Sequence, residues 1–192
     1  MYPPLGTNDY GPYLTQVAQA KPEATYNFYS GSDAVRFVKQ YGEYGLKDGI
    51  KLTGAGFLLE QDVLPAQGDA ALGGISGLHY AITLDNPENT KFKADYKAKF
   101  GTDANVFAVQ GWDTARVIVD ALNAVQGDTS DKEKLIEAIA AVKFASPRGP
   151  FEFDPDTHHV VQNIYVREVK KVEGTNQNVV LDTVERVRDP GK

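Results

Sequence analysis

Cysteine is absent from all 192 residues, which removes disulfides, thiolate nucleophiles and cysteine-ligated metals together. This absence fits a protein of an export compartment. No apolar run approaches the roughly 20 residues that a membrane-spanning helix needs, and the N-terminus does not resemble a signal peptide. The net charge of -6 argues against a nucleic-acid partner. The composition is that of an ordinary globular chain, long enough for one core or two modest ones.

Motifs for catalysis are also missing. There is no serine in a nucleophile elbow, no phosphate-binding loop of the Walker type and no complete dinucleotide fingerprint, because Gly54-Ala55-Gly56 lacks the third glycine. The adjacent His158 and His159 would point to opposite faces of an extended segment, so they are poorly placed to chelate one metal. The sequence therefore predicts a protein that is not an enzyme and holds no metal or cofactor, with a small α/β enzyme as the less favoured alternative.

Two strand-turn-helix segments stand out instead. The aromatic run 26–29 is typical of a strand, and it is followed by small residues and a helical pattern to Gly45, capped by Ser32 or Asp33. A second short strand, 51–54, ends in the small-residue turn 54–57. In parallel sheets, turns at the carboxyl ends of strands hold small and often anionic ligands, although such a turn can also simply connect two elements.

The middle of the chain is predicted to be helical without any strand, from residue 86 to 142. Asn86 and Pro87 are typical of a helix start, Gly101 ends that helix, a longer helix covers 107–125, and Ser130 opens a third as the first residue of a capping box. The apolar stripes of these helices need partners that this segment does not contain. Strands return after residue 146, with a long hairpin formed by 163–172 and 179–187.

Several segments, taken in their order and spacing, resemble the C-terminal half of type I periplasmic solute-binding proteins of the Leu/Ile/Val (branched-chain amino acid) family of ABC importers. The segments that carry the resemblance are Tyr2–Tyr10, Phe28–Gly31, Phe37–Gln40, Leu52–Phe57, Asp69–Gly73, Val109–Asp113, Ser146–Pro150 and Asn163–Val169. The resemblance covers nearly the whole chain.

The resemblance implies a two-lobe α/β fold in which the ligand lies between lobes joined by three hinge crossings. In that fold, residues 1–84 would belong to the second lobe, 85–148 would supply helices to the first lobe, and 149–192 would return to the second lobe with the terminal strands. The expected sheet is mainly parallel, with flanking helices and a C-terminal antiparallel hairpin. The chain is therefore expected to be incomplete relative to the two-lobe fold, and to associate with the missing half or with a second copy.

The resemblance also implies ligand contacts from two turns and a solute-receptor function. The residues at these positions are Tyr29, Ser30, Gly31, Ala55, Gly56 and Phe57, and Trp112 either borders the cleft or belongs to the core. Family members that bind free amino acids commonly place an acid in the second turn, where this chain has Gly56. A ligand ammonium buried without a counter-charge costs several kcal/mol, so an aromatic or hydrophobic carboxylate is favoured over an aliphatic amino acid.

The implied partners are the small-molecule ligand and a membrane permease, and the implied location is the periplasm, or the cell surface on a lipid anchor in a Gram-positive host. A sensory ligand-binding domain of the same fold, coupled to a receptor, is the alternative.

Overall fold

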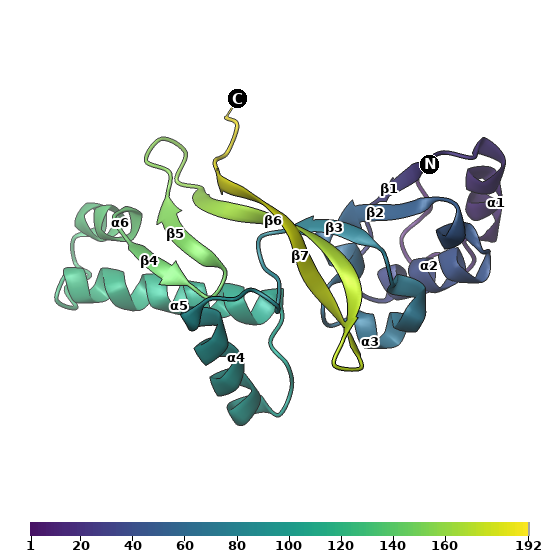
Figure 1. Cartoon of the computed structure of the whole chain (residues 1–192). Helices are drawn as coiled ribbons and strands as arrows, with labels where there is room; N and C mark the ends of the chain where they lie inside the picture. The colour runs from purple at the N-terminus through teal and green to yellow at the C-terminus, as the bar shows by residue number, and fades with distance from the viewer. Residues whose placement is uncertain (192) are drawn as a thin grey trace. The chain divides into compact units, whose positions relative to one another are not determined.

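The structure, a computed structural model, describes residues 1–191, which form two compact units (Figure 1). Unit 1 comprises residues 1–83 and 165–182; unit 2 comprises residues 84–164 and the C-terminal residues from 183 onward. The chain therefore passes between the units three times. The structure groups residues 149–164 with the helical segment, because β4, β5 and the start of β6 pair with one another. The assignment of the units to lobes of a longer fold stays a prediction.

Unit 1 is built on a mixed sheet. Its elements are α1 (Gly11–Ala20), β1 (Ala24–Asn27), α2 (Gly31–Glu43), η1 (Leu46–Asp48), β2 (Lys51–Ala55), η2 (Gly56–Leu59), α3 (Leu64–Gln67), η3 (Gly68–Ala71), β3 (Ile75–Leu78), and parts of β6 (Val160–Val172) and β7 (Thr175–Val187). β1, β2 and β3 run parallel, and β3 pairs antiparallel with β6. The parallel part of the sheet therefore ends at β3. β7 pairs with β6, and these two strands form the predicted hairpin, which turns at Glu173 and Gly174.

The core of unit 1 lies between this sheet and the helices that cover it. Its buried members come from the segments 10–14, 34–52 and 58–71, and Val169 joins them from β6. They are Tyr10, Leu14, Ala34, Phe37, Val38, Tyr41, Leu46, Ile50, Leu52, Leu58, Leu59, Leu64, Ala71 and Val169. Burial of these apolar side chains stabilises unit 1, and it thereby fixes the positions of the strand ends.

The predicted strand-turn-helix is present, but its strand β1 spans Ala24–Asn27 and not 26–29, and the cap of helix α2 differs from the prediction. Gly45 follows with φ +67°, the left-handed conformation expected there. Ser32 and Asp33 do not cap the helix, because it already begins at Gly31, three residues before the first apolar residue, Ala34; its N-cap Ser30 makes no side-chain capping bond. The Asp33 carboxylate instead accepts a hydrogen bond from the Gly6 amide and pairs with Arg36.

Unit 2 contains the three predicted helices and a small antiparallel sheet. The helices are α4 (Pro87–Phe100), α5 (Val106–Ala124) and α6 (Lys132–Ala140), followed by β4 (Lys143–Ser146) and β5 (Gly149–Phe153). β5 pairs with β4 and with the first residues of β6. The sequence did not indicate β4, which is only four residues long and carries a single large apolar residue, Phe144.

The helix starts of unit 2 follow side-chain capping. The Asn86 side chain accepts from the Asn89 amide as predicted, and α4 ends at Gly101 with φ +74°. The predicted capping box at Ser130 is wrong: Asp131 caps α6 by accepting from the Lys134 amide, because the helix begins one residue later than that box requires. None of the helices within residues 1–191 combines the length and apolar character needed to cross a bilayer.

Candidate functional site

The two predicted turns lie at the same edge of the unit 1 sheet. β1 and β2 are parallel neighbours in a register that places Asn27 opposite Gly54. The residues that follow them, 28–31 and 55–57, therefore start side by side at the carboxyl ends of the two strands. This is the position at which open α/β sheets bind ligands. Ligand contact by these residues stays a prediction.

Tyr29 is anchored in an aromatic cluster. Its ring centroid lies 4.7 Å from that of Phe37 and 5.4 Å from that of Tyr10, which in turn packs edge-on against Phe37. Burial raises the pKa of the Tyr29 phenol, and it raises the pKa of Tyr10 to about 12. Both phenols are therefore neutral near pH 7 and can donate hydrogen bonds. A ring fixed in this way can present a defined wall to a ligand.

A groove of about 490 Å³ adjoins the first turn. It includes Tyr29 and Ser30 from the predicted set, and it is lined by Met1, Tyr2, Pro3, Leu5, Tyr26, Asn27, Phe28, Tyr29, Ser30 and Asp33. Tyr26 and Phe28 expose 77 % and 66 % of their surface, which is unusual for large rings on strand residues or their immediate followers. The sequence pattern indicated only that these aromatic residues favour a strand. The alternation of Tyr26 and Phe28 with Asn27 and Tyr29 also indicates that the two pairs of side chains point to opposite sides of the chain.

The second turn is fixed by close packing. A side chain at Gly56 would come within 2.5 Å of the Leu78 Cβ, and one at Gly54 within 2.6 Å of the Leu58 Cδ2. Gly56 is therefore buried against β3, and any ligand contact from it would be made by its backbone. Ala55 and Phe57, on either side, are half-buried. The absence of an acid at Gly56 thus has a packing cause: no side chain fits there without moving Leu78.

Arg167 lies beneath this turn, and sequence reasoning did not single it out. Its guanidinium is buried and donates to Glu60 Oε2 at 3.0 Å, to the Gly56 carbonyl at 3.1 Å and to Ser76 Oγ at 3.1 Å. Arg167 shares the buried face of β6 with Tyr165 and Val169. A charged residue usually lies in solvent, and this one can be buried because Glu60, Ser76 and the Gly56 carbonyl accept its hydrogen bonds.

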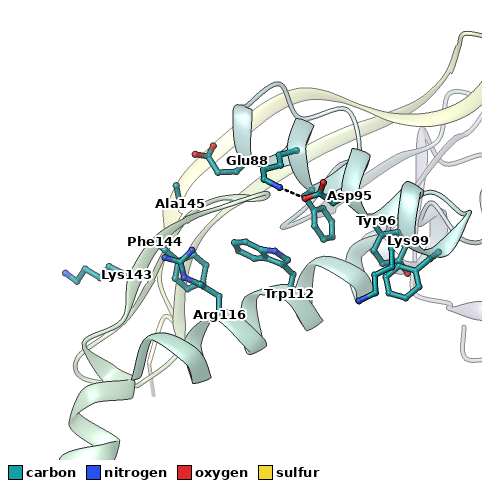
Figure 2. A pocket seen from close by; sticks show the side chains of 12 residues that line it. Glu88, Asp95, Tyr96, Lys99, Trp112, Arg116, Lys143, Phe144 and Ala145 are labelled. Atoms are coloured by element: carbon teal, nitrogen blue, oxygen red, sulfur yellow. Dashed lines mark hydrogen bonds and ion pairs between the residues drawn. The ribbon is translucent and has the colours of Figure 1, made fainter. Parts of the chain in front are cut away.

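Trp112 lies on α5 of unit 2 and borders a groove of about 800 Å³ (Figure 2). Its ring packs against Phe144 on β4 at 5.8 Å and against Phe92 on α4 at 6.4 Å. The Arg116 guanidinium lies over the Phe144 ring at 5.5 Å, and Lys91 pairs with Asp95 on the rim. Trp112 is therefore both packed and at a groove; a role toward ligand stays a prediction.

Asp113 lies within α5 and is buried. Its carboxylate accepts from Ser146 Oγ at 2.6 Å and pairs with Arg148, which also donates to Gln162. This cluster ties α5 to the strands of unit 2. Within residues 1–191, no group of three or more histidine and carboxylate side chains is placed to hold a metal ion.

Comparison with known proteins decides the family. The model for a periplasmic binding protein matches residues 1–176. The chain belongs to the periplasmic binding protein family. The type I fold of this family, expected from the sequence motifs, is confirmed: a structure described as an ABC transporter substrate-binding protein from Sphaerobacter thermophilus superposes with a TM-score of 0.91 and 39% identity, over 96% of this chain and 51% of that one.

Two further relatives show similar levels of identity. A Leu/Ile/Val-binding protein homolog 6 of Brucella melitensis is 37% identical over 98% of this chain and 49% of its own length. A solute binding protein of an ABC transporter from Rhodopseudomonas palustris BisB5, in complex with 3,4-dihydroxy benzoic acid, is 38% identical over 95% of this chain and 50% of that one, with a TM-score of 0.88. The chain therefore spans about half the length of the relatives it matches.

Proposed function

We propose that this chain is part of an extracytoplasmic solute-binding protein that captures an aromatic carboxylate and delivers it to the permease of an ABC importer. The turns 28–31 and 55–57 would form one wall of the binding site. Capture of this kind needs no catalytic group, in keeping with relatives that are binding proteins and not enzymes.

The similarity to relatives with benzoates bound carries the choice of ligand class. Besides the dihydroxybenzoate complex, Rhodopseudomonas palustris proteins solved with benzoate and with 4-hydroxybenzoate are 39% and 35% identical to this chain. A leucine-binding protein from Thermotoga maritima is 21% identical and shares the fold alone.

The site chemistry supports the same choice. Neutral Tyr29 and the exposed rings of Tyr26 and Phe28 offer flat apolar surface for stacking, which suits an aromatic ring. Gly56 supplies no carboxylate, and the packing of Leu78 leaves no room for one. An α-ammonium group would therefore find no counter-charge in the second turn, and burying it unpaired would be costly.

Calorimetric titration of the protein as it is naturally expressed tests the proposal. 4-Hydroxybenzoate, benzoate and L-leucine are compared at one pH, with cyclohexanecarboxylate as a carboxylate of similar size without an aromatic ring. The expected order places the two benzoates at least about 10-fold tighter than cyclohexanecarboxylate and leucine. Leucine binding tighter than both benzoates would overturn the ligand class, and no binding of any of the four would overturn a receptor for small carboxylates.

A further inference from the structure

The segment that leaves β2, residues 54–60, is held from inside the protein by three buried side chains. η2 is too short to satisfy its own carbonyls through helical hydrogen bonds. Arg167 donates to the Gly56 carbonyl at 3.1 Å, Gln67 to the Leu58 carbonyl at 2.8 Å, and Asn178 to the Leu59 carbonyl at 2.7 Å. The three donors come from β6, α3 and β7, so three separate elements fix one short turn.

Arg167 makes the most extensive of these connections. Besides the Gly56 carbonyl, it donates to the Tyr80 carbonyl at 2.6 Å, to Ser76 Oγ, and to Glu60, with which it forms an ion pair at 3.0 Å. Both charges are almost completely buried, Arg167 being 1 % and Glu60 2 % exposed. One guanidinium therefore connects both ends of the turn to β3 and to the residues that follow it.

A buried ion pair of this kind is poorly explained by stability alone. Removing two charges from water costs several kcal/mol each, and well-packed apolar residues of similar volume often replace such pairs without loss of stability. The planar fork of arginine, however, can serve several acceptors in a fixed geometry, which lysine or an apolar residue cannot do.

The same network reaches the segments through which the chain leaves unit 1. Tyr80 is three residues before the first crossing at Thr83, and Arg167 is three residues after the second crossing at 164. Asn178, which holds the Leu59 carbonyl, accepts a hydrogen bond from Thr83 Oγ1 through its own carbonyl at 2.6 Å. The turn and the crossing segments of unit 1 are thus joined by hydrogen bonds that are buried at Arg167 and Leu59 and part-buried at Thr83.

We propose that Arg167 is a positioning residue: it holds the turn 54–60 in its ligand-competent conformation and ties that turn to residues 80–83 and 165–167, where the chain passes between units. The proposal rests on the proposed function for the ligand, but not for the ordering of the turn. Arg167 itself need not touch the ligand.

The test compares three variants of the naturally expressed protein by melting temperature and by affinity for 4-hydroxybenzoate. Arg167→Met removes the cation that pairs with the buried Glu60 carboxylate, so both the melting temperature and the affinity are expected to fall. Arg167→Met combined with Glu60→Met removes both charges and is expected to recover most of the melting temperature while the affinity stays at least about 10-fold weaker. Val169→Ala, a buried site on the same strand whose side chain makes no hydrogen bonds, is expected to lower the melting temperature and leave the affinity within about twofold.

Hydrogen exchange without ligand gives a second, independent readout. Arg167→Met and the double variant are expected to speed amide exchange at 54–60 and 80–83. Val169→Ala is expected to speed exchange at these amides only as much as its overall loss of stability accounts for. Wild-type affinity in the double variant, or equal exchange in all three variants, would overturn the positioning role. If the wild type binds no carboxylate, the proposed function fails, and the exchange measurement still decides whether Arg167 orders the turn.

Discussion

Units 1 and 2 bury their apolar residues to very different degrees. In unit 1 the sheet and its helices share one core, in which Leu14, Val38, Leu59 and Leu64 are fully or almost fully buried. In unit 2, α6 has no buried residue, and α5 exposes about half of the surface of Ile118 and Val119. Unit 1 thus carries a continuous core, whereas α5 and α6 of unit 2 leave large apolar side chains such as Ile118, Val119 and Ile136 exposed.

The difference shows which interactions stabilise each unit. Unit 1 depends on apolar packing, with the Arg167 network beneath one turn. Unit 2 has fewer buried apolar side chains, and the cluster of Asp113, Ser146 and Arg148 links its long helix to its strands. Each prediction below tests one side of this contrast.

The largest effect is expected from breaking the polar cluster of unit 2. Asp113→Ala removes the carboxylate that pairs with the buried Arg148, and the expected loss of unfolding free energy is about 3–5 kcal/mol. Denaturant unfolding measures it. The control is Asp120→Ala on the same helix, which removes a partly exposed pair with Arg116 and should cost no more than about 1 kcal/mol. Equal effects of the two substitutions would mean that the buried cluster has no special role.

Two helix residues compare the apolar packing directly. Leu14→Ala in α1 empties a buried site and is expected to cost about 2–5 kcal/mol. Ile136→Ala in α6 removes a side chain that is 58 % exposed, so its cost should stay within about 0.5 kcal/mol. Denaturant curves at low protein concentration give both values. A large loss for Ile136→Ala would show that something covers α6 in solution.

Helix capping gives a smaller effect and decides between two residues. Asp131→Ala should lower the unfolding free energy by about 1 kcal/mol, because the Lys134 amide loses its acceptor. Ser130→Ala should have less effect, since the Ser130 hydroxyl donates to Asp128 and does not cap α6. Denaturant unfolding of the two variants under the same conditions measures both losses. The reverse order would restore the capping box expected from the sequence.

Asp154 adds a small pH-dependent contribution in unit 2. A hydrogen bond from Arg188, followed by the Asp156 amide, holds the pKa of the Asp154 carboxyl well below its usual range. A lowered pKa means that this carboxylate stabilises the fold above its unfolded pKa of about 3.9 and loses that contribution as the pH falls. Asp154→Asn should therefore melt below the wild type at pH 7, with the gap closing below about pH 4. A gap that widens on acidification would contradict this.

The sequence could predict the strand-turn-helix order, the helix ends near Gly45 and Gly101, and the family fold. Glycines after helices and the spacing of apolar residues are local signals, so they can be recognised without the structure. Asp131 as a cap was missed because Ser130 and Glu133 offer an equally good local pattern one residue earlier. Arg167, Glu60 and Asp113 were missed for a different reason. Their burial depends on partners about 30 to 110 residues away, and no local pattern separates them from solvent-exposed charges.

The central claim is that ligand binds at the carboxyl ends of β1 and β2 in unit 1. Amide hydrogen exchange of the naturally expressed protein, with and without saturating 4-hydroxybenzoate, tests it most directly. The account predicts slower exchange at residues 28–31 and 54–60. Protection that leaves both turns unchanged and falls instead on the residues around Trp112 would contradict it.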